Sequence, residues 1–183
     1  MQIKLKKGSI APDFKVTSPW SDTQYSFVDR PSKKSSIIFF LRYYGCLICQ
    51  LDIKKIKDQI DTFHKRDLEV YVIIQSESKT IQEKTNEVDW NFNIVCDPEA
   101  VIYEKYGVVT GNIFQFLHPT GLPKVIKSLR VGHKHGKFEG EETQLPAVFK
   151  VDENNKIDFA YYGKHISDLP DFETIINETS KKN

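Results

Sequence analysis

The chain has 183 residues, of which 39% are hydrophobic and 28% are charged, as in an ordinary globular protein with a sizeable core. Its formal net charge of +1 gives no bulk attraction to nucleic acid or anionic lipid, so we expect neither as a partner. No apolar run approaches the roughly 20 residues of a membrane span. The N-terminus lacks the apolar core of a signal peptide. These features predict a single domain, residues 1–183, that is cytoplasmic and has no membrane partner.

Residues 1–34 predict an N-terminal extension of short extended pieces and turns. Residues 37–41 are apolar without alternation, which is typical of a central strand covered on both faces. After Cys46 and Cys49, apolar residues recur at helical spacing as far as Phe63, which predicts an amphipathic helix. The elements expected next are a strand at 68–74, a polar helix at 78–88, a short strand at 92–95 and a short helix at 100–106.

This alternation of strands and helices predicts parallel strands, but residues 108–143 interrupt it. They are rich in Gly and Pro, so we expect an insertion of loops with one short helix near residues 124–129. Residues 147–151 and 157–162 then predict a β-hairpin, and residues 168–179 predict a closing helix. The expected fold is therefore α/β, with a central mixed sheet flanked by helices.

The cysteine pair lies where the predicted strand gives way to the predicted helix. A thiol attacks as its thiolate, and the start of a helix stabilises an anion through its unpaired N–H groups. Arg42, four residues before Cys46, adds a positive charge, and the spacing of Cys46 and Cys49 allows a disulfide within one turn. Three cysteines, an odd number, argue against a structural disulfide framework. The pattern indicates a redox pair.

Two other interpretations of the pair stay open. Free cysteines are often small buried hydrophobes. A CxxC pair is also half of a structural zinc site, but such a site uses four ligands. The remaining Cys96 and five histidines form no second pair of that kind, so no metal is expected.

Cys96 and Pro146 lie near the ends of predicted strands. If the strand that ends at Cys96 is two places from the central one, it is about 10 Å away. A disulfide needs Cα atoms within about 7 Å, so we interpret Cys96 as a packing residue rather than a resolving cysteine. Pro146 begins the strand at 147–151, where a turn proline is tolerated. The alternative is a cis-proline that brings backbone beside the reactive sulfur.

Four stretches of the chain together form a fairly specific family pattern through their order and spacing. They are GSIAPDF, FFLRYYGCLICQLD, CDPEAVIYEKYGV and LPAVFKVDENNKI. The first resembles the opening G-x-x-A-P-x-F of the AhpC/TSA peroxiredoxins (alkyl hydroperoxide reductase and thiol-specific antioxidant proteins). The others resemble that family's active-site loop, its S-D-P segment and its P-x-x-F-x-x-D hairpin. The similarity spans residues 8–163 apart from the insertion at 108–143, and it is greatest to the peroxiredoxin-like branch with a CxxC pair. It implies a thioredoxin-like fold.

The family's active site reads P-x-x-x-T-x-x-C, with an acid three residues later. In this register Arg42 replaces the proline and Cys46 replaces the threonine, whose hydroxyl is a better hydrogen-bonding group than a thiol. Cys49 then takes the place of the peroxidatic cysteine and Asp52 that of the acid. The family also has a second arginine from a later strand, for which Arg130 is the candidate in this chain.

Resemblance to thioredoxin-like proteins implies a different nucleophile, Cys46, because in those proteins the first cysteine of CxxC is the exposed attacking residue. We expect Cys46 to attack, since it should lie nearer the loop and the solvent than Cys49. Tyr44 and Gly45, in the loop just before Cys46, are supporting candidates, as is Pro146.

The sequence thus predicts a thiol-dependent oxidoreductase that reduces peroxides through a Cys46–Cys49 thiol/disulfide cycle. An external dithiol, such as a thioredoxin-like protein, would recycle it. The alternatives are a thiol-disulfide reductase without peroxidase activity, and a non-enzymatic zinc-binding or redox-sensing module. No cofactor is expected, and the family resemblance implies a homodimer by analogy.

Overall fold

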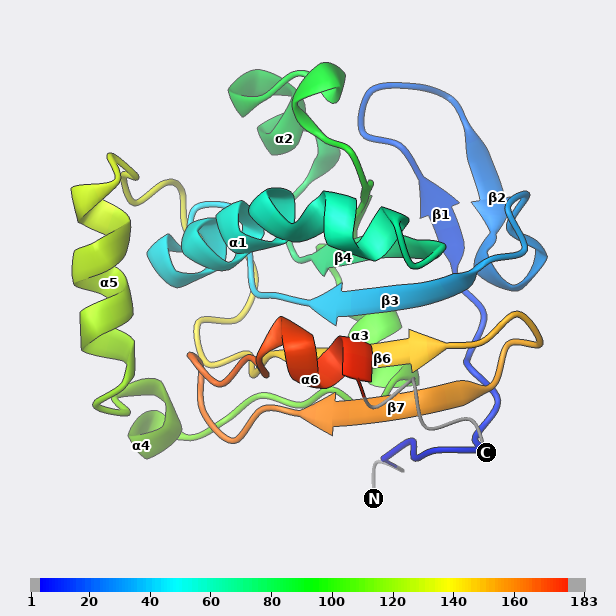
Figure 1. The fold of residues 1–183 in the computed structure, drawn as a ribbon. Helices are drawn as coiled ribbons and strands as arrows, with labels where there is room; N and C mark the ends of the chain where they lie inside the picture. The colour runs from blue at the N-terminus through cyan, green and yellow to red at the C-terminus, as the bar shows by residue number, and fades with distance from the viewer. Residues whose placement is uncertain (1–3, 178–183) are drawn as a thin grey trace.

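A five-stranded mixed sheet forms the centre of the protein, of which the computed structural model describes residues 4–177 (Figure 1). Its strands, in spatial order, are β5 (Asn93–Cys96), β4 (Leu68–Ile74), β3 (Ser35–Phe40), β6 (Ala147–Val151) and β7 (Ile157–Tyr162). The first three run parallel, whereas β6 and β7 are antiparallel to their neighbours. A separate hairpin joins β1 (Lys15–Thr17) to β2 (Gln24–Ser26).

The central strand β3 is buried on both faces. Successive side chains of a strand point to opposite faces, so Ile37 and Phe39 pack on one side and Ile38 and Phe40 on the other, all fully buried. This confirms the interpretation of the uninterrupted apolar run as a central strand. The parallel β4 on one side and the antiparallel β6 on the other then fix the mixed sheet.

Helices cover both faces of the sheet. They are α1 (Leu47–His64), α2 (Ser78–Lys84), α3 (Val101–Lys105), α4 (Ile113–Phe116), α5 (Gly121–Arg130) and α6 (Phe172–Asn177). The long α1 and the short α6 lie on one face, and α3 lies on the other (Figure 1). In α1, the predicted apolar stripe through Ile56, Ile60 and Phe63 is buried against the sheet. Among residues 4–177, no helix is both long and apolar enough to cross a bilayer.

Two predicted helices have bounds that differ from those expected. The helix expected over 78–88 ends at Lys84, and a separate 3-10 turn follows at Glu87–Asp89. The closing helix begins at Phe172 instead of Asp168, because Pro170 lies just before it. Its expected end at Thr179 lies outside the described residues.

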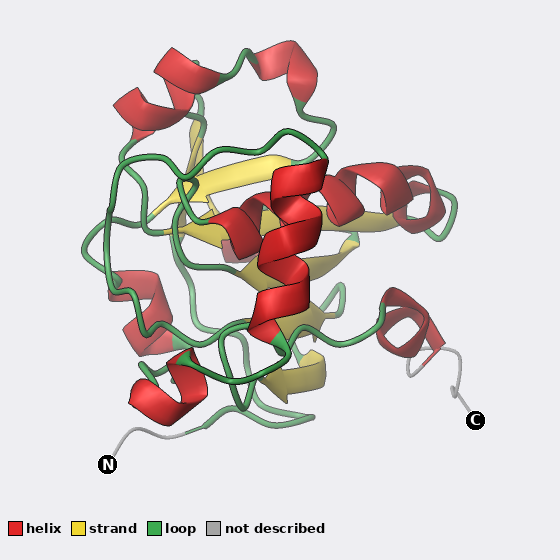
Figure 2. Cartoon of the chain, turned by 90° about the vertical axis from the view of Figure 1, so that its left-hand side faces the viewer, coloured by secondary structure: helices red, strands yellow, loops and turns green. Residues whose placement is uncertain are grey.

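The short helix expected near residues 124–129 is present as the longer α5, but the segment 108–143 also contains α4, which was not expected. Asn112 caps α4, and its side-chain oxygen accepts hydrogen bonds from two backbone N–H groups of the first turn. Pro123 lies in the first turn of α5, where a missing N–H breaks no helical hydrogen bond. α5 lies at the edge of the molecule beside the start of α1, and Figure 2 shows it in front on that side.

Candidate active site

Cys46 is the N-cap residue of α1, at the point where β3 and its following loop end. Its Sγ accepts a hydrogen bond from the backbone N–H of Cys49, 3.2 Å away. The Nη2 of Arg42 donates a second hydrogen bond to the same sulfur over 2.8 Å. A sulfur at the positive end of a helix, with a guanidinium as donor, is arranged to carry a negative charge.

The two thiols titrate in opposite directions. Burial opposes the Cys46 thiolate, but the hydrogen bonds with Cys49 and the charge of Arg42 outweigh it and lower the pKa of Cys46 to about 7. Burial, together with the neighbouring Cys46, raises the pKa of Cys49 well above its ordinary value. Near neutral pH, Cys46 is therefore the sulfur that ionises. Both thiols are free in this structure, as is Cys96.

The expectation that Cys46 lies nearer the solvent is wrong. Its exposed fraction is 2%, against 4% for Cys49, so exposure does not distinguish the two sulfurs. The difference between them is electrostatic, because Arg42 and the helix start favour charge on Cys46.

Arg42 is itself buried and held from the opposite side by Glu142. Its Nη1 donates to the main-chain oxygen of Glu142 and lies 3.5 Å from the carboxylate of the same residue. Burial opposes the charge of Arg42, but the two thiols and Glu142 outweigh it and raise the pKa of Arg42, which stays protonated. The Nε of Arg42 is buried and has no hydrogen-bond partner among residues 4–177.

Tyr43 and Glu142 belong to this site and were missed in the sequence. The hydroxyl of Tyr43 donates to the Glu142 carboxylate, and its ring lies near those of His135 and Phe138, at 6.3 and 6.4 Å between centroids. Burial and Glu142 raise the pKa of Tyr43 far above its ordinary value. Tyr43 adjoins a predicted site residue, but nothing in the sequence places Glu142 beside a residue 100 positions earlier.

Residues 121–142, here called the cover segment, close over the start of α1. Gly136 N–H donates to Gly45 O over 2.9 Å, and a Cβ on Gly45 would meet Lys137 O at 2.5 Å, so this approach needs glycine. Gln50 Nε2 donates to Lys134 O over 2.9 Å. The cover segment thus lies directly against the loop and the helix start that carry the cysteines.

Two side chains join α5 to the first turns of α1. Ser128 Oγ donates to Leu47 O over 2.7 Å. Asp52, the family's acid in the predicted register, is buried and pairs with Lys124 of α5 at 3.3 Å and with Lys55 at 3.2 Å. Asp52 therefore holds the cover segment in place.

The other residues singled out from the sequence have separate surroundings. The ring of Tyr44 packs 6.2 Å from that of Trp90. The cis interpretation of Pro146 is wrong, because no peptide bond among residues 4–177 is cis. Arg130 is exposed on the outer face of α5, so the structure does not bring it to the cysteines. Cys96 ends the edge strand β5, two places from β3, and burial raises its pKa to about 11, in keeping with a packing residue.

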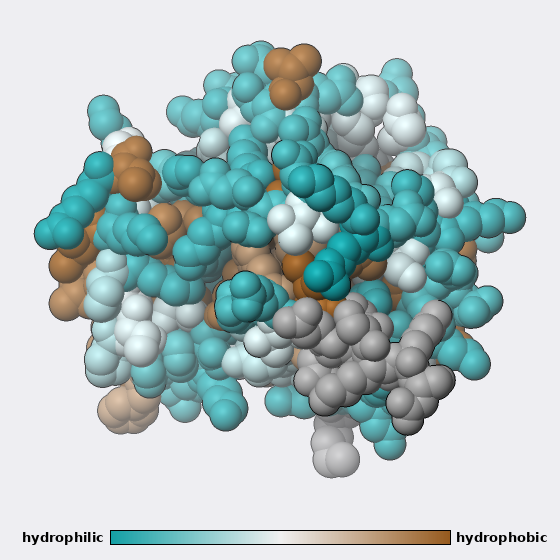
Figure 3. All heavy atoms as spheres, viewed as in Figure 1, coloured by the Kyte–Doolittle hydropathy of each residue, from teal (hydrophilic) through white to brown (hydrophobic). Residues whose placement is uncertain are grey.

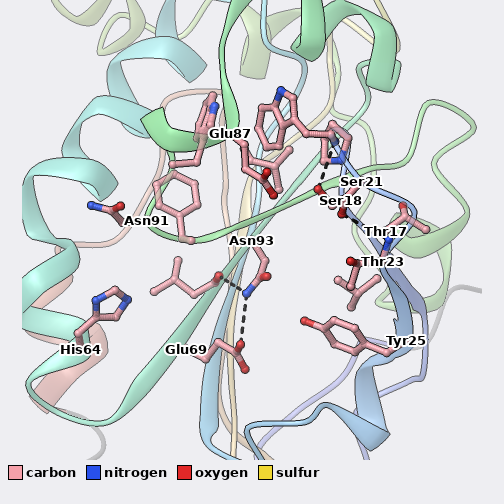
Figure 4. A pocket seen from close by; sticks show the side chains of 17 residues that line it. Thr17, Ser18, Ser21, Thr23, Tyr25, His64, Glu69, Glu87, Asn91 and Asn93 are labelled. Atoms are coloured by element: carbon pink, nitrogen blue, oxygen red, sulfur yellow. Dashed lines mark hydrogen bonds between the residues drawn. The ribbon is translucent and has the colours of Figure 1, made fainter.

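The structure also has a cavity that lies apart from the thiols. A cavity of about 390 Å³ opens between the β1–β2 hairpin and β5, where Tyr25, His64, Glu69 and Asn93 surround it (Figure 4). No cysteine lines this cavity. Among the described residues, no group of three or more His, Cys, Asp or Glu side chains could hold a metal ion.

Several solved structures with similar folds are named as peroxiredoxins, peroxiredoxin-like proteins or thiol peroxidases. A 2-Cys peroxiredoxin from Plasmodium vivax superposes with a TM-score of 0.67 at 16% identity, over 96% of this chain and 84% of that one. A peroxiredoxin-like protein from Aquifex aeolicus gives 0.68 at 17% identity, over 98% and 88%. A thiol peroxidase from Chromobacterium violaceum gives 0.67 at 13% identity, over 99% and 90%. These likenesses confirm the thioredoxin-like fold of peroxiredoxins.

At the level of sequence, no curated protein matches the chain significantly. The model of the AhpC/TSA family matches residues 8–160, which is most of the chain and includes the cysteine pair. This match supports a thiol-dependent redox function in general terms. The chain belongs to the AhpC/TSA family.

Proposed function

We propose that the chain is a thiol peroxidase in which Cys46 attacks the peroxide and Cys49 resolves the product. The observation that carries the proposal is the 2.8 Å bond from Arg42 to the sulfur of Cys46 at the start of α1. It supports a thiolate on Cys46 near neutral pH, which is the attacking form. The raised pKa of Cys49 keeps the second sulfur protonated until the first has reacted.

The reaction has two steps. The Cys46 thiolate bonds to one peroxide oxygen, the O–O bond breaks, and the other oxygen takes a proton from solvent and leaves as water or an alcohol. Cys46 is thereby oxidised to a sulfenic acid. The sulfur of Cys49 then displaces the hydroxyl, which leaves with the thiol proton as water, and a Cys46–Cys49 disulfide forms. An external dithiol, such as a thioredoxin-like protein, reduces this disulfide and is itself oxidised.

The burial of the site supports a small substrate. Cys46 is 2% exposed beneath the cover segment, so a bulky disulfide reaches its sulfur only if that segment moves. Hydrogen peroxide needs far less space. The unpartnered Nε–H of Arg42 is also available to a peroxide oxygen.

A second candidate is thiol-disulfide exchange without peroxidase activity. The specific observation in its favour is the order of the pKa values, low on the first cysteine of the pair and high on the second. This order suits an enzyme whose first sulfur attacks a disulfide and whose second releases the mixed disulfide.

Stopped-flow oxidation by hydrogen peroxide tests the proposal on two variants. With Cys49→Ser, we expect a sulfenic acid on Cys46, formed much faster than on free glutathione and identified by trapping and mass spectrometry. With Cys46→Ser, we expect no fast reaction. A rate for Cys49→Ser no greater than that of glutathione would remove the peroxidase function. Rapid reduction of a test disulfide by the wild type in that case would favour the second candidate.

A further inference from the structure

α5 is oriented against the usual rule for a surface helix. Such a helix normally turns its apolar stripe toward the core. Here Leu122, Ile126 and Leu129, spaced to lie on one face, are 66%, 41% and 52% exposed. The face that meets α1 carries Gly121 and Ser128, both buried, together with the half-buried Val125.

Cations accompany this exposed apolar stripe. Pro123, Lys127 and Arg130 share the outer surface of α5 with Leu122 and Ile126. Over residues 106–138, which include α4, α5 and most of the cover segment, the sequence has five Lys or Arg residues and no Asp or Glu. The net charge of +1 hides this asymmetry, because the rest of the chain is negative overall.

More apolar side chains extend the same edge of the molecule. Phe114 and Leu117 are exposed on and just after α4, which lies next to the N-terminal end of α5 (Figures 1 and 2). Val131, directly after α5, is also exposed. Figure 3 shows hydrophobic residues gathered at the left-hand edge, where Figure 1 places α5. We define the outer face as Ile113, Phe114, Leu117, Leu122, Ile126, Leu129 and Val131 with Lys127 and Arg130.

We propose that this outer face binds the surface of an anionic lipid bilayer. An apolar stripe beside a cationic one matches acyl chains bordered by negative headgroups. Two copies of the chain fit this face less well, because a symmetric contact sets like patches against each other and would bring the cations of one copy against those of the next. The inference is independent of the chemistry at Cys46, and it replaces the expectation from net charge that lipid is no partner.

Sedimentation with vesicles tests the proposal on the full chain. We expect the wild type to sediment with vesicles of phosphatidylcholine and phosphatidylglycerol, but not with phosphatidylcholine alone, and to be released as salt rises. Ile126→Gln or Leu129→Gln should weaken binding about tenfold, because an apolar side chain no longer enters the bilayer. Lys127→Gln should weaken it roughly fivefold, the effect of one cation near a charged surface.

Matched controls come from elsewhere on the surface. Val88, 88% exposed on the turn after α2, and Lys79 of α2 also lie in solvent, so Val88→Gln and Lys79→Gln should bind vesicles as the wild type does. Circular dichroism checks that each variant is folded, and the salt titration of the wild type needs no variant.

Three results would overturn the proposal. The first is that the wild type stays in the supernatant when anionic vesicles are sedimented at low salt. The second is that Ile126→Gln and Leu129→Gln bind the vesicles as tightly as Val88→Gln does. A dimer in analytical ultracentrifugation that Ile126→Gln dissociates, without vesicle binding, would assign the face to a second copy of this chain.

Discussion

α1 and α5 meet at the cysteine pair, yet opposite kinds of contact hold them there. α1 buries its apolar stripe, with Ile56 and Phe63 fully enclosed against the sheet. α5 exposes its apolar stripe and is attached through Ser128 and Lys124, which bond to Leu47 and Asp52 of α1. Apolar burial contributes far more to stability than a few hydrogen bonds and partly exposed ion pairs. The site therefore combines a rigid floor with a cover that is held weakly.

Truncating one apolar side chain in each helix should affect the stability of the protein very differently. Ile56→Ala should lower the free energy of unfolding by about 2–5 kcal/mol, because it leaves a cavity in the core. Val125→Ala, on the half-buried inner side of α5, should cost less than about 1.5 kcal/mol. Urea denaturation measures both. Equal losses would show that α5 is as integral to the core as α1.

Arg42 lies where the two regions join, and its removal should change the thiolate. Arg42→Gln should raise the pKa of Cys46 by about 1–3 units, because the sulfur loses an adjacent positive charge and a donor. Ultraviolet absorbance of the thiolate across a pH series measures this. Arg66→Gln, at the exposed end of α1, is the matched control and should leave the pKa of Cys46 where it is, at about 7.

Glu142→Gln should shift the same titration in the opposite direction. It removes a carboxylate beside Arg42 but leaves the main-chain oxygen that holds the guanidinium. The positive charge of Arg42 is then less neutralised, so the pKa of Cys46 should fall below about 7. A rise in both variants would indicate that Arg42 acts by packing and not by charge.

Ser128→Ala should loosen the cover without unfolding the protein. Losing its hydrogen bond to Leu47 should lower the free energy of unfolding by about 1 kcal/mol. The two thiols should react faster with a bulky aromatic disulfide, since the cover opens more often. Ser32→Ala removes an exposed side-chain hydrogen bond to Glu69 and serves as the control. Unchanged thiol reactivity in Ser128→Ala would contradict a weakly held cover.

The smallest expected effect concerns a pair of stacked histidines that joins the chain before α5 to the loop after β7. The rings of His118 and His165 lie 3.8 Å apart with an interplanar angle of 2°. Burial lowers the pKa of His165, although Asp168 opposes this, so the fold favours the neutral ring. The stability that comes from keeping His165 neutral is fully present above the ordinary histidine pKa of about 6.5. It is lost as the pH falls through the lowered pKa of His165 in the folded protein. In urea denaturation across a pH series, His165→Gln should slightly flatten the pH dependence of the midpoint. His64→Gln, at an exposed position, is the control and should leave that dependence unchanged.

The strands and the start of α1 could be predicted because their signals are local. β4, β6 and β7 have the bounds expected from their apolar and β-branched residues. α1 begins one residue after Cys46, as its helical spacing indicates. Local patterns also gave the position of the thiols at a helix start.

The cover could not be predicted, since its contacts link residues far apart in the chain. Periodicity alone would turn Leu122 and Ile126 inward, whereas the structure turns Ser128 and Lys124 inward toward partners on α1. The position of Cys46 beside a loop had likewise suggested an exposed sulfur, whereas the structure buries it among core residues.

The bond between Arg42 and the sulfur of Cys46 has a consequence for redox poise. It is strongest while that sulfur is ionised, and a sulfur engaged in a disulfide carries no charge. Among residues 4–177, oxidation would therefore leave Glu142 as the one carboxylate paired with this buried guanidinium. The dithiol form is therefore stabilised relative to the disulfide form. This raises the reduction potential of the pair, so that the disulfide is easier to reduce than it would be without Arg42.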